Sequence, residues 1–139
     1  MPVNAEIKDG KGTKNKAKVT TLGQLVVAPL EFSTAYAVEA DTINTAFNFV
    51  GPVVDQNFIV TDILLYANKG VGAGDASVQL YEADSATSTT STKTILDIEM
   101  LKQTARDMTG LNLKVTTGKW LNIKTDDNTI FATIMGYYA

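Results

Sequence analysis

The stretch LNLKVTTGKWLNIKTDDNTIFATIMGYY, residues 111–138, decides the fold class. Apolar and polar residues alternate along it with a period of two, the period at which side chains of a strand return to one face. Residues 116–118 and 126–128 interrupt this alternation with amino acids typical of turns. We therefore predict three strands here, joined by two successive hairpins, a pattern typical of all-β proteins.

Most of the chain before residue 111 follows the same pattern of short strands and turns. Strands are also predicted over residues 19–28, 42–50, 58–68, 76–83 and 94–101. The segment 58–68 is apolar at both parities, which predicts a central strand buried on both faces for part of its length. Residues 30–41 receive no assignment, and residues 102–109 are compatible with a short helical turn.

These elements predict an all-β fold, because no predicted helix is long enough to cross over a parallel sheet. About eight strands in a chain of 139 residues fit a two-sheet antiparallel β-sandwich. The jelly roll is the favoured form of this sandwich, and an immunoglobulin-like sandwich is the alternative.

The composition indicates a binding or structural protein and not an enzyme. The chain contains no cysteine and no histidine. These absences exclude disulfides, the usual zinc sites, and Ser-His-Asp or Cys-His catalysis. We expect no catalytic residue, no cofactor and no metal. The N-terminus lacks the apolar core of a secretory signal, and no apolar run is long enough to span a membrane. We therefore expect synthesis in the cytoplasm of the producing cell.

Charge is distributed unevenly along the chain. The net charge is −3, yet residues 1–18 carry five lysines against two acidic residues, a net charge of +3. This predicts a basic, extended N-terminal arm, residues 1–18, in front of a sandwich domain, residues 19–139. The arm is either a solvated tail or a segment that docks on an acidic protein surface, such as the body of another copy. Nucleic-acid binding is weakly indicated, because no arginine or aromatic residue accompanies the lysines.

Three segments carry side chains that could form a site. Asp126 and Asp127 are adjacent carboxylates, which would point to opposite faces of a strand and make a poor acid–base pair. Asp127 and Asn128 could instead bind calcium, although an Asx-turn is the favoured interpretation. The glycine-rich loop 70–75 does not match a phosphate-binding pattern. The Ser/Thr-rich loop 84–92 could be a contact loop, a glycan target or a solvated connection, and the solvated connection is the favoured interpretation.

Aromatic residues offer two further possibilities. Trp120 could stack on a sugar ring, although core packing is the favoured use of such a side chain. The chain ends in Tyr137 and Tyr138, followed by Ala139. These two tyrosines either bind a partner protein or complete the last strand of the domain itself.

Four segments together resemble small virion proteins of tailed phages. They are GQLVVAP at 23–29, NFIVTDI at 57–63, VQLYEA at 78–83 and IMGYY at 134–138. The resemblance covers about residues 19–139 and is to capsid decoration, or cement, proteins of the jelly-roll type. It implies self-association about a two-fold or three-fold axis and an extended terminus laid over coat subunits.

The resemblance and the composition predict a non-catalytic protein that binds and stabilises the outer surface of a phage capsid. The expected partners are the major capsid protein and further copies of the chain, as a dimer or trimer, on the virion surface. The predicted partner-binding residues are Val3, Ile7, Lys8, Lys11, Lys14, Lys16, Lys18, Tyr137 and Tyr138. Val3 and Ile7 are expected to act as apolar anchors, with strand addition to a neighbouring sheet. The alternative is a receptor- or carbohydrate-binding module of a tail or fibre, with loops 70–75 and 84–92 and Trp120 forming its site.

Overall fold

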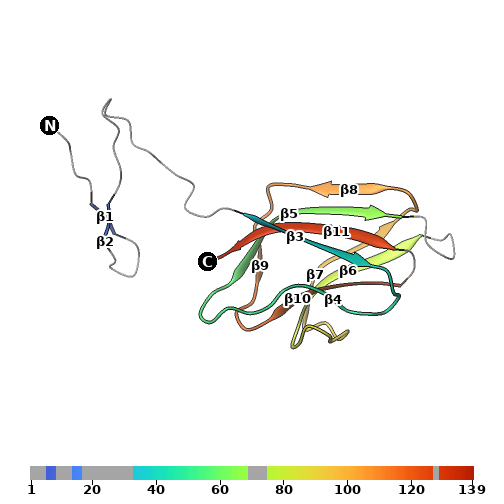
Figure 1. Cartoon of the computed structure of the whole chain (residues 1–139), viewed down its shortest axis with the longest axis horizontal. Helices are drawn as coiled ribbons and strands as arrows, with labels where there is room; N and C mark the ends of the chain where they lie inside the picture. Colours follow the sequence, from blue (N-terminus) through green and yellow to red (C-terminus); the bar gives the residue numbers. More distant parts are fainter. Residues whose placement is uncertain (1–5, 9–13, 17–32, 69–74, 127–128) are drawn as a thin grey trace, which may run out of the picture. The chain divides into compact units, whose positions relative to one another are not determined.

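The computed structural model describes residues 6–8, 14–16, 33–68, 75–126 and 129–139 (Figure 1). The chain divides into two compact units, residues 1–32 and residues 33–139. In the first unit, β1 (Glu6–Lys8) and β2 (Lys14–Lys16) pair as antiparallel strands. The predicted arm boundary at residues 18 and 19 and the predicted strand 19–28 lie outside the described residues.

The second unit, called the body here, is a β-sandwich of two antiparallel sheets that face each other (Figure 1). One sheet has the order β3 (Thr34–Ala40), β11 (Ile130–Tyr138), β5 (Phe58–Ala67), and then β8 (Ala105–Met108) with β9 (Leu113–Val115). The other has the order β4 (Phe47–Val50), β10 (Trp120–Thr125), β6 (Ala76–Ala83), β7 (Lys93–Met100). The described residues contain no helix. The predicted all-β sandwich is confirmed.

The strand order is that of a jelly roll. Strands β8 and β9 both pair with β5, at its two ends, and therefore act as one interrupted strand. With this pair counted once, the described residues of the body form eight strands. The first pairs with the last, the second with the seventh, the third with the sixth, and the fourth with the fifth. This nested pairing across two four-strand layers is the favoured jelly roll, and not the immunoglobulin-like alternative.

Both hairpins predicted near the C-terminus are wrong, although the strands themselves are present. Strand β10 lies in the opposite sheet from β9 and β11, so the chain passes from one sheet to the other between β9 and β10 and again between β10 and β11. Among the described strands of the body, only β6 and β7 are consecutive in the chain and paired. Alternation predicts which face of a strand is buried, but it does not identify the neighbouring strand.

A buried carboxylate holds the first of these corners. Glu82 on β6 is 2% exposed. Its Oε1 accepts hydrogen bonds from the backbone N–H of Thr116 (2.7 Å), the Thr116 hydroxyl (3.0 Å) and the Lys93 ammonium (3.2 Å). A buried carboxylate needs such donors, so Glu82 ties the turn after β9 to the opposite sheet.

Strand β5 is fully buried on one face at a time, and not on both faces for part of its length as predicted. Phe58 and Val60 are buried, and the buried positions then shift parity to Ile63 and Leu65. The register explains this shift, because Asp62 lies opposite Met135 while Val60 lies opposite Gly136. Thr61 is therefore the extra residue of a β-bulge. The bulge moves the apolar parity along the strand, which produces the continuous apolar pattern in the sequence.

Three other segments differ from the predicted elements. Residues 34–40, left unassigned, form β3. Residues 105–108 form the strand β8 and not a helical turn, because they complete the sheet beside β5. The expected strand 42–50 is shortened to β4, after a turn in which Asn44 has a φ of 52°. The core between the sheets includes Phe49, Phe58, Val60, Ile63, Leu65, Val78, Leu80, Met100, Leu121, Ile123, Ile130 and Ile134.

Candidate functional site

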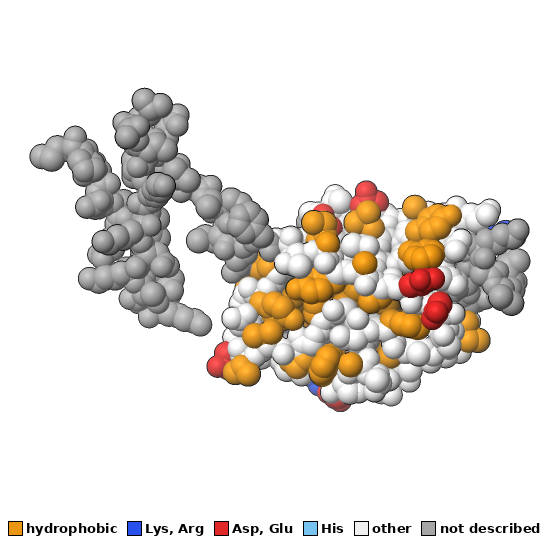
Figure 2. Space-filling view, viewed as in Figure 1, with side chains coloured by type: hydrophobic (Ala, Val, Ile, Leu, Met, Phe, Trp, Pro, Cys, Tyr) orange, Lys and Arg blue, Asp and Glu red, His pale blue; other side chains and the backbone are white. Residues whose placement is uncertain are grey.

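The outer side of the β3-β11-β5-β8 sheet carries an unusual number of apolar side chains. Alternation directs Ile130, Ile134 and their register partners into the core, and directs the residues between them outward. The apolar members of this outward set are called the apolar face below, and they are Ala35, Ala37, Ile59, Leu64, Tyr66, Ala105, Phe131, Met135 and Tyr137. Figure 2 shows hydrophobic side chains at the surface of the body, with acidic side chains nearby.

The largest side chains of the apolar face are open to solvent. Leu64 is 45% exposed, Tyr66 43% and Phe131 39%. Tyr66 and Phe131 are register partners on neighbouring strands, and their rings stack with centroids 6.3 Å apart. A hollow of about 260 Å³ lies beside Phe131 on β3 and β11, where Ala37 presents only a methyl group. Such a surface, with large exposed rings beside a shallow hollow, is typical of protein–protein contact.

Carboxylates border the apolar face. Glu39 is the register partner of Phe131, Asp62 of Met135, and Asp107 of Leu64, so all three belong to the outward set of positions. The basic residue Lys114 is the partner of Ile59, toward the other end of the sheet. One part of the apolar face is therefore acidic, which favours a partner that is both apolar and basic.

The two terminal tyrosines lie on opposite sides of the sheet. The ring of Tyr138 packs edge-on against Phe58 at 5.1 Å, and its hydroxyl donates to the carbonyl oxygen of Gly51 at 2.8 Å. Tyr137 is half-buried and lies on the apolar face as the register partner of Ile59. Tyr138 thus completes the domain's own packing, while Tyr137 is placed where a partner could contact it.

Burial raises the pKa of Tyr138, and the neighbouring Tyr36 raises it further. Because the pKa of the Tyr138 hydroxyl is higher in the folded than in the unfolded chain, its contribution to the free energy of unfolding is complete below about pH 10. This contribution is lost as pH rises through the folded-state pKa. We expect Tyr138→Phe to flatten the decline in stability above pH 10 relative to the unsubstituted chain. Urea unfolding at pH 8 and pH 11 measures this; equal declines in both proteins would refute it.

The outer side of the other sheet is covered by a polar network and not by apolar side chains. The amide nitrogen of Asn122, which is fully buried, donates to the carbonyl oxygens of Ser85 (2.9 Å) and Ser88 (3.2 Å). Its amide oxygen accepts from Asn48 at 3.0 Å. The hydroxyl of Tyr81, which is also fully buried, donates a hydrogen bond to the carbonyl oxygen of Ser88 at 2.8 Å. The Ser/Thr-rich loop is therefore held on the sheet through its backbone carbonyl oxygens, while most of its residues are exposed, as predicted for a solvated connection.

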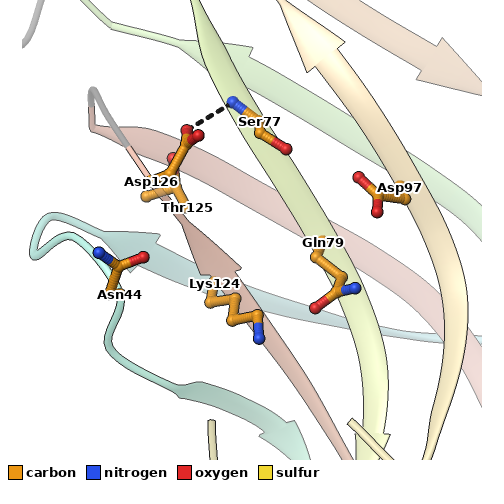
Figure 3. A pocket seen from close by; sticks show the side chains of 7 residues that line it. All are labelled: Asn44, Ser77, Gln79, Asp97, Lys124, Thr125 and Asp126. Carbon is orange, nitrogen blue, oxygen red and sulfur yellow. Dashed lines mark hydrogen bonds between the residues drawn. The ribbon is translucent and has the colours of Figure 1, made fainter. Parts of the chain in front are cut away.

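A small polar pocket lies beside this network (Figure 3). Its volume is about 130 Å³, and its lining includes Lys124, Gln79 and Asp97, register neighbours on β10, β6 and β7. At one end Asp126 accepts a hydrogen bond from the backbone N–H of Ser77 at 2.7 Å, as Figure 3 shows. The Asp126 carboxylate thus secures the start of β6. Asp127 and Asn128 lie outside the described residues.

Within the described ranges, no group of three or more Asp or Glu residues is placed to hold a metal ion. No helix of the described residues is long and apolar enough to cross a membrane.

The alternative site, that of a receptor-binding module, was predicted from loops 70–75 and 84–92 and Trp120. Loop 70–75 precedes Ala76 and loop 84–92 follows Ala83, so the two loops join opposite ends of β6, roughly 23 Å apart at 3.3 Å per residue. Trp120 packs against Gly51, where an added Cβ would lie 2.8 Å from its ring. Trp120 is the register partner of Ala83, so it lies at the end of β6 that leads into loop 84–92. Residues 70–74 lie outside the described residues, and the composite site of both loops and Trp120 stays a prediction.

The predicted arm residues lie in the N-terminal unit. Ile7 and Lys8 belong to β1, and Lys14 and Lys16 to β2. Val3, Lys11 and Lys18 lie outside the described residues. The role of these residues in binding stays a prediction.

The apolar face was not predicted from the sequence, although the residue pattern of the last strand indicates it. In residues 130–138, Phe131, Met135 and Tyr137 make the second parity apolar as well as the buried one. In a two-sheet sandwich the other sheet covers only the inner face of a strand. A strand that is apolar at both parities therefore indicates that its outer face contacts a partner.

Comparison with known proteins finds a distant likeness in structure and none in sequence. No protein-family model and no curated protein matches the sequence. A solved structure of a Bacillus endospore appendage, from a novel family of disulfide-linked pili, is similar, with 13% identity and a TM-score of 0.47. The match covers 81% of this chain and 93% of that one. We infer nothing about function from so distant a likeness. The present chain has no cysteine and cannot form disulfides.

Proposed function

We propose that this chain is a non-catalytic structural protein that binds and stabilises the outer surface of a tailed-phage capsid, with its N-terminal arm docked on a neighbouring subunit. The proposal places the protein on the virion, after synthesis in the host cytoplasm. Its partners are the major capsid protein and further copies of itself.

The apolar face is the observation that carries this proposal. The body already has a complete core between its two sheets, so the exposed Leu64, Tyr66 and Phe131 are not needed to fold it. Exposed aromatic and aliphatic side chains on one sheet are costly in water unless a partner covers them. The jelly roll agrees with the resemblance to decoration proteins, and the polar groups of the opposite sheet are occupied in holding its own loop.

The basic arm is expected to contribute binding energy beyond its charge. Ordering an extended segment costs roughly 1–2 kcal/mol of backbone entropy per residue. Exposed lysine pairs return only about 0–1 kcal/mol each. Apolar anchors such as Val3 and Ile7, together with backbone hydrogen bonds, are therefore needed to offset the cost.

We expect removal of residues 1–18 to weaken binding to purified capsids at least 100-fold. Replacing the five arm lysines by glutamine in the full-length chain should weaken it about tenfold and remove its salt dependence. Cosedimentation with capsids at 50 and 300 mM salt measures both effects, and thermal unfolding shows whether each variant is folded. Unchanged capsid affinity in the truncated chain would contradict the proposed role of the arm.

A further inference from the structure

The N-terminal unit and the body of this chain have complementary chemistry. Residues 1–32 carry five lysines against three acidic residues, a net charge of +2. Residues 33–139 carry seven basic and twelve acidic residues, a net charge of −5. Residues 19–32, VTTLGQLVVAPLEF, add a strongly apolar stretch to the basic one. The first unit thus combines the two properties that the apolar face requires of a partner.

The apolar face of a second copy is a less suitable partner, because it is apolar but not basic. Each face would bring Glu39, Asp62 and Asp107 into the same interface. Charges of one sign gathered across a contact of low dielectric repel each other, whereas lysines opposite the same carboxylates attract them. Electrostatics therefore favours a basic segment over a second apolar face.

We propose that the apolar face binds residues 1–32 of a neighbouring copy, so that copies are joined by exchanged N-terminal segments. The lysines of one copy lie along Glu39, Asp62 and Asp107 of the next, and apolar side chains of the same segment cover Tyr66 and Phe131. The choice of a neighbouring copy, in place of the chain's own segment, rests on the proposed function, in which the arm binds a neighbouring subunit. Each copy both donates a segment and offers a face, so the contact propagates from copy to copy.

Zero-length crosslinking of mixed isotopic forms tests the exchange. Unlabelled and ¹⁵N-labelled full-length chains are mixed and treated with a carbodiimide, which joins lysines to carboxylates in direct contact. We expect crosslinks from Lys8, Lys11, Lys14, Lys16 or Lys18 to Glu39, Asp62 or Asp107, with the two isotopes combined in one crosslinked peptide. Crosslinks within one isotopic form only would show binding of the chain's own segment and overturn the proposal, as would the absence of crosslinks to these carboxylates.

Charge reversal on the two sheets provides a matched comparison in the full-length chain. Asp62→Lys with Asp107→Lys changes the apolar face, while Asp97→Lys with Glu99→Lys makes the same change in net charge on the exposed side of β7. Sedimentation at 50 mM salt should show self-association weakened at least tenfold by the first pair and less than twofold by the second. Equal effects of both pairs, or a monomeric unsubstituted chain, would overturn the exchange.

Capsid binding separates this inference from the proposed function. Mixed-isotope crosslinks in a protein that does not bind capsids would sustain the exchange and remove the capsid role. Capsid binding by a protein without mixed crosslinks would sustain that role and overturn the exchange.

Discussion

Gly136→Ala is expected to lower the free energy of unfolding by about 3 kcal/mol or more, and the melting temperature by about 10 °C. A Cβ at this position would lie 2.3 Å from the backbone oxygen of Ile59 and 2.5 Å from the ring of Phe58. The oxygen belongs to a central strand of the sheet, and Phe58 is packed between Tyr36 and Tyr138. Neither neighbour is able to move without opening the register at the bulge in β5.

Gly118→Ala is the matched control. Gly118 has a φ of 82°, and an added Cβ there would meet no atom within 4 Å. Its cost is limited to the left-handed backbone, about 1 kcal/mol. Urea unfolding of both variants gives the comparison. A loss of stability at Gly136 no larger than that at Gly118 would show that the close approach of β11 to β5 is wrong.

Asn122→Ala is expected to destabilise the body by about 2–3 kcal/mol and to release the loop 84–92 for proteolysis. The substitution removes two hydrogen bonds donated to Ser85 and Ser88 and one accepted from Asn48. Partners left buried without a hydrogen bond cost about 1–3 kcal/mol, which is more than the bond itself contributes. The loop loses the buried amide that holds it on the sheet.

Asn112→Ala, in an exposed position before β9, provides the control and should change stability by less than about 0.5 kcal/mol. Limited proteolysis followed by mass spectrometry locates the first cleavage in each variant. We expect cleavage within 84–92 in Asn122→Ala before any cleavage in the rest of the body. If both variants show the same melting temperature and the same cleavage sites, the loop does not depend on Asn122.

The sequence was sufficient to predict strands and the β-sandwich, since both depend on alternation. Val78 and Leu80, for example, repeat at the spacing that strand geometry requires, and both are buried. Strand partners were not predictable in this way. Leu121 and Ile123 are buried in either a hairpin or a crossing between sheets, so their pattern is the same for both.

The candidate site was harder to predict from the sequence than the fold, because it depends on which apolar residues remain exposed to solvent. Leu64 and Tyr66 were assigned to a second buried face, and the bulge at Thr61 shows that they point outward. Similarly, Asn122 and Ser88 are polar residues that sequence alone places in solvent. They are brought together by strands far apart in the chain. Local periodicity contains no information on such long-range contacts.

The measurement that tests the proposed function most directly is the copy number of this protein in purified particles of the phage that encodes it. Quantitative mass spectrometry, with isotope-labelled peptides from this chain and from the major coat protein, provides the ratio. A decoration protein that covers the capsid surface should approach the copy number of the coat protein. A handful of copies per particle, or none, would contradict the proposed function.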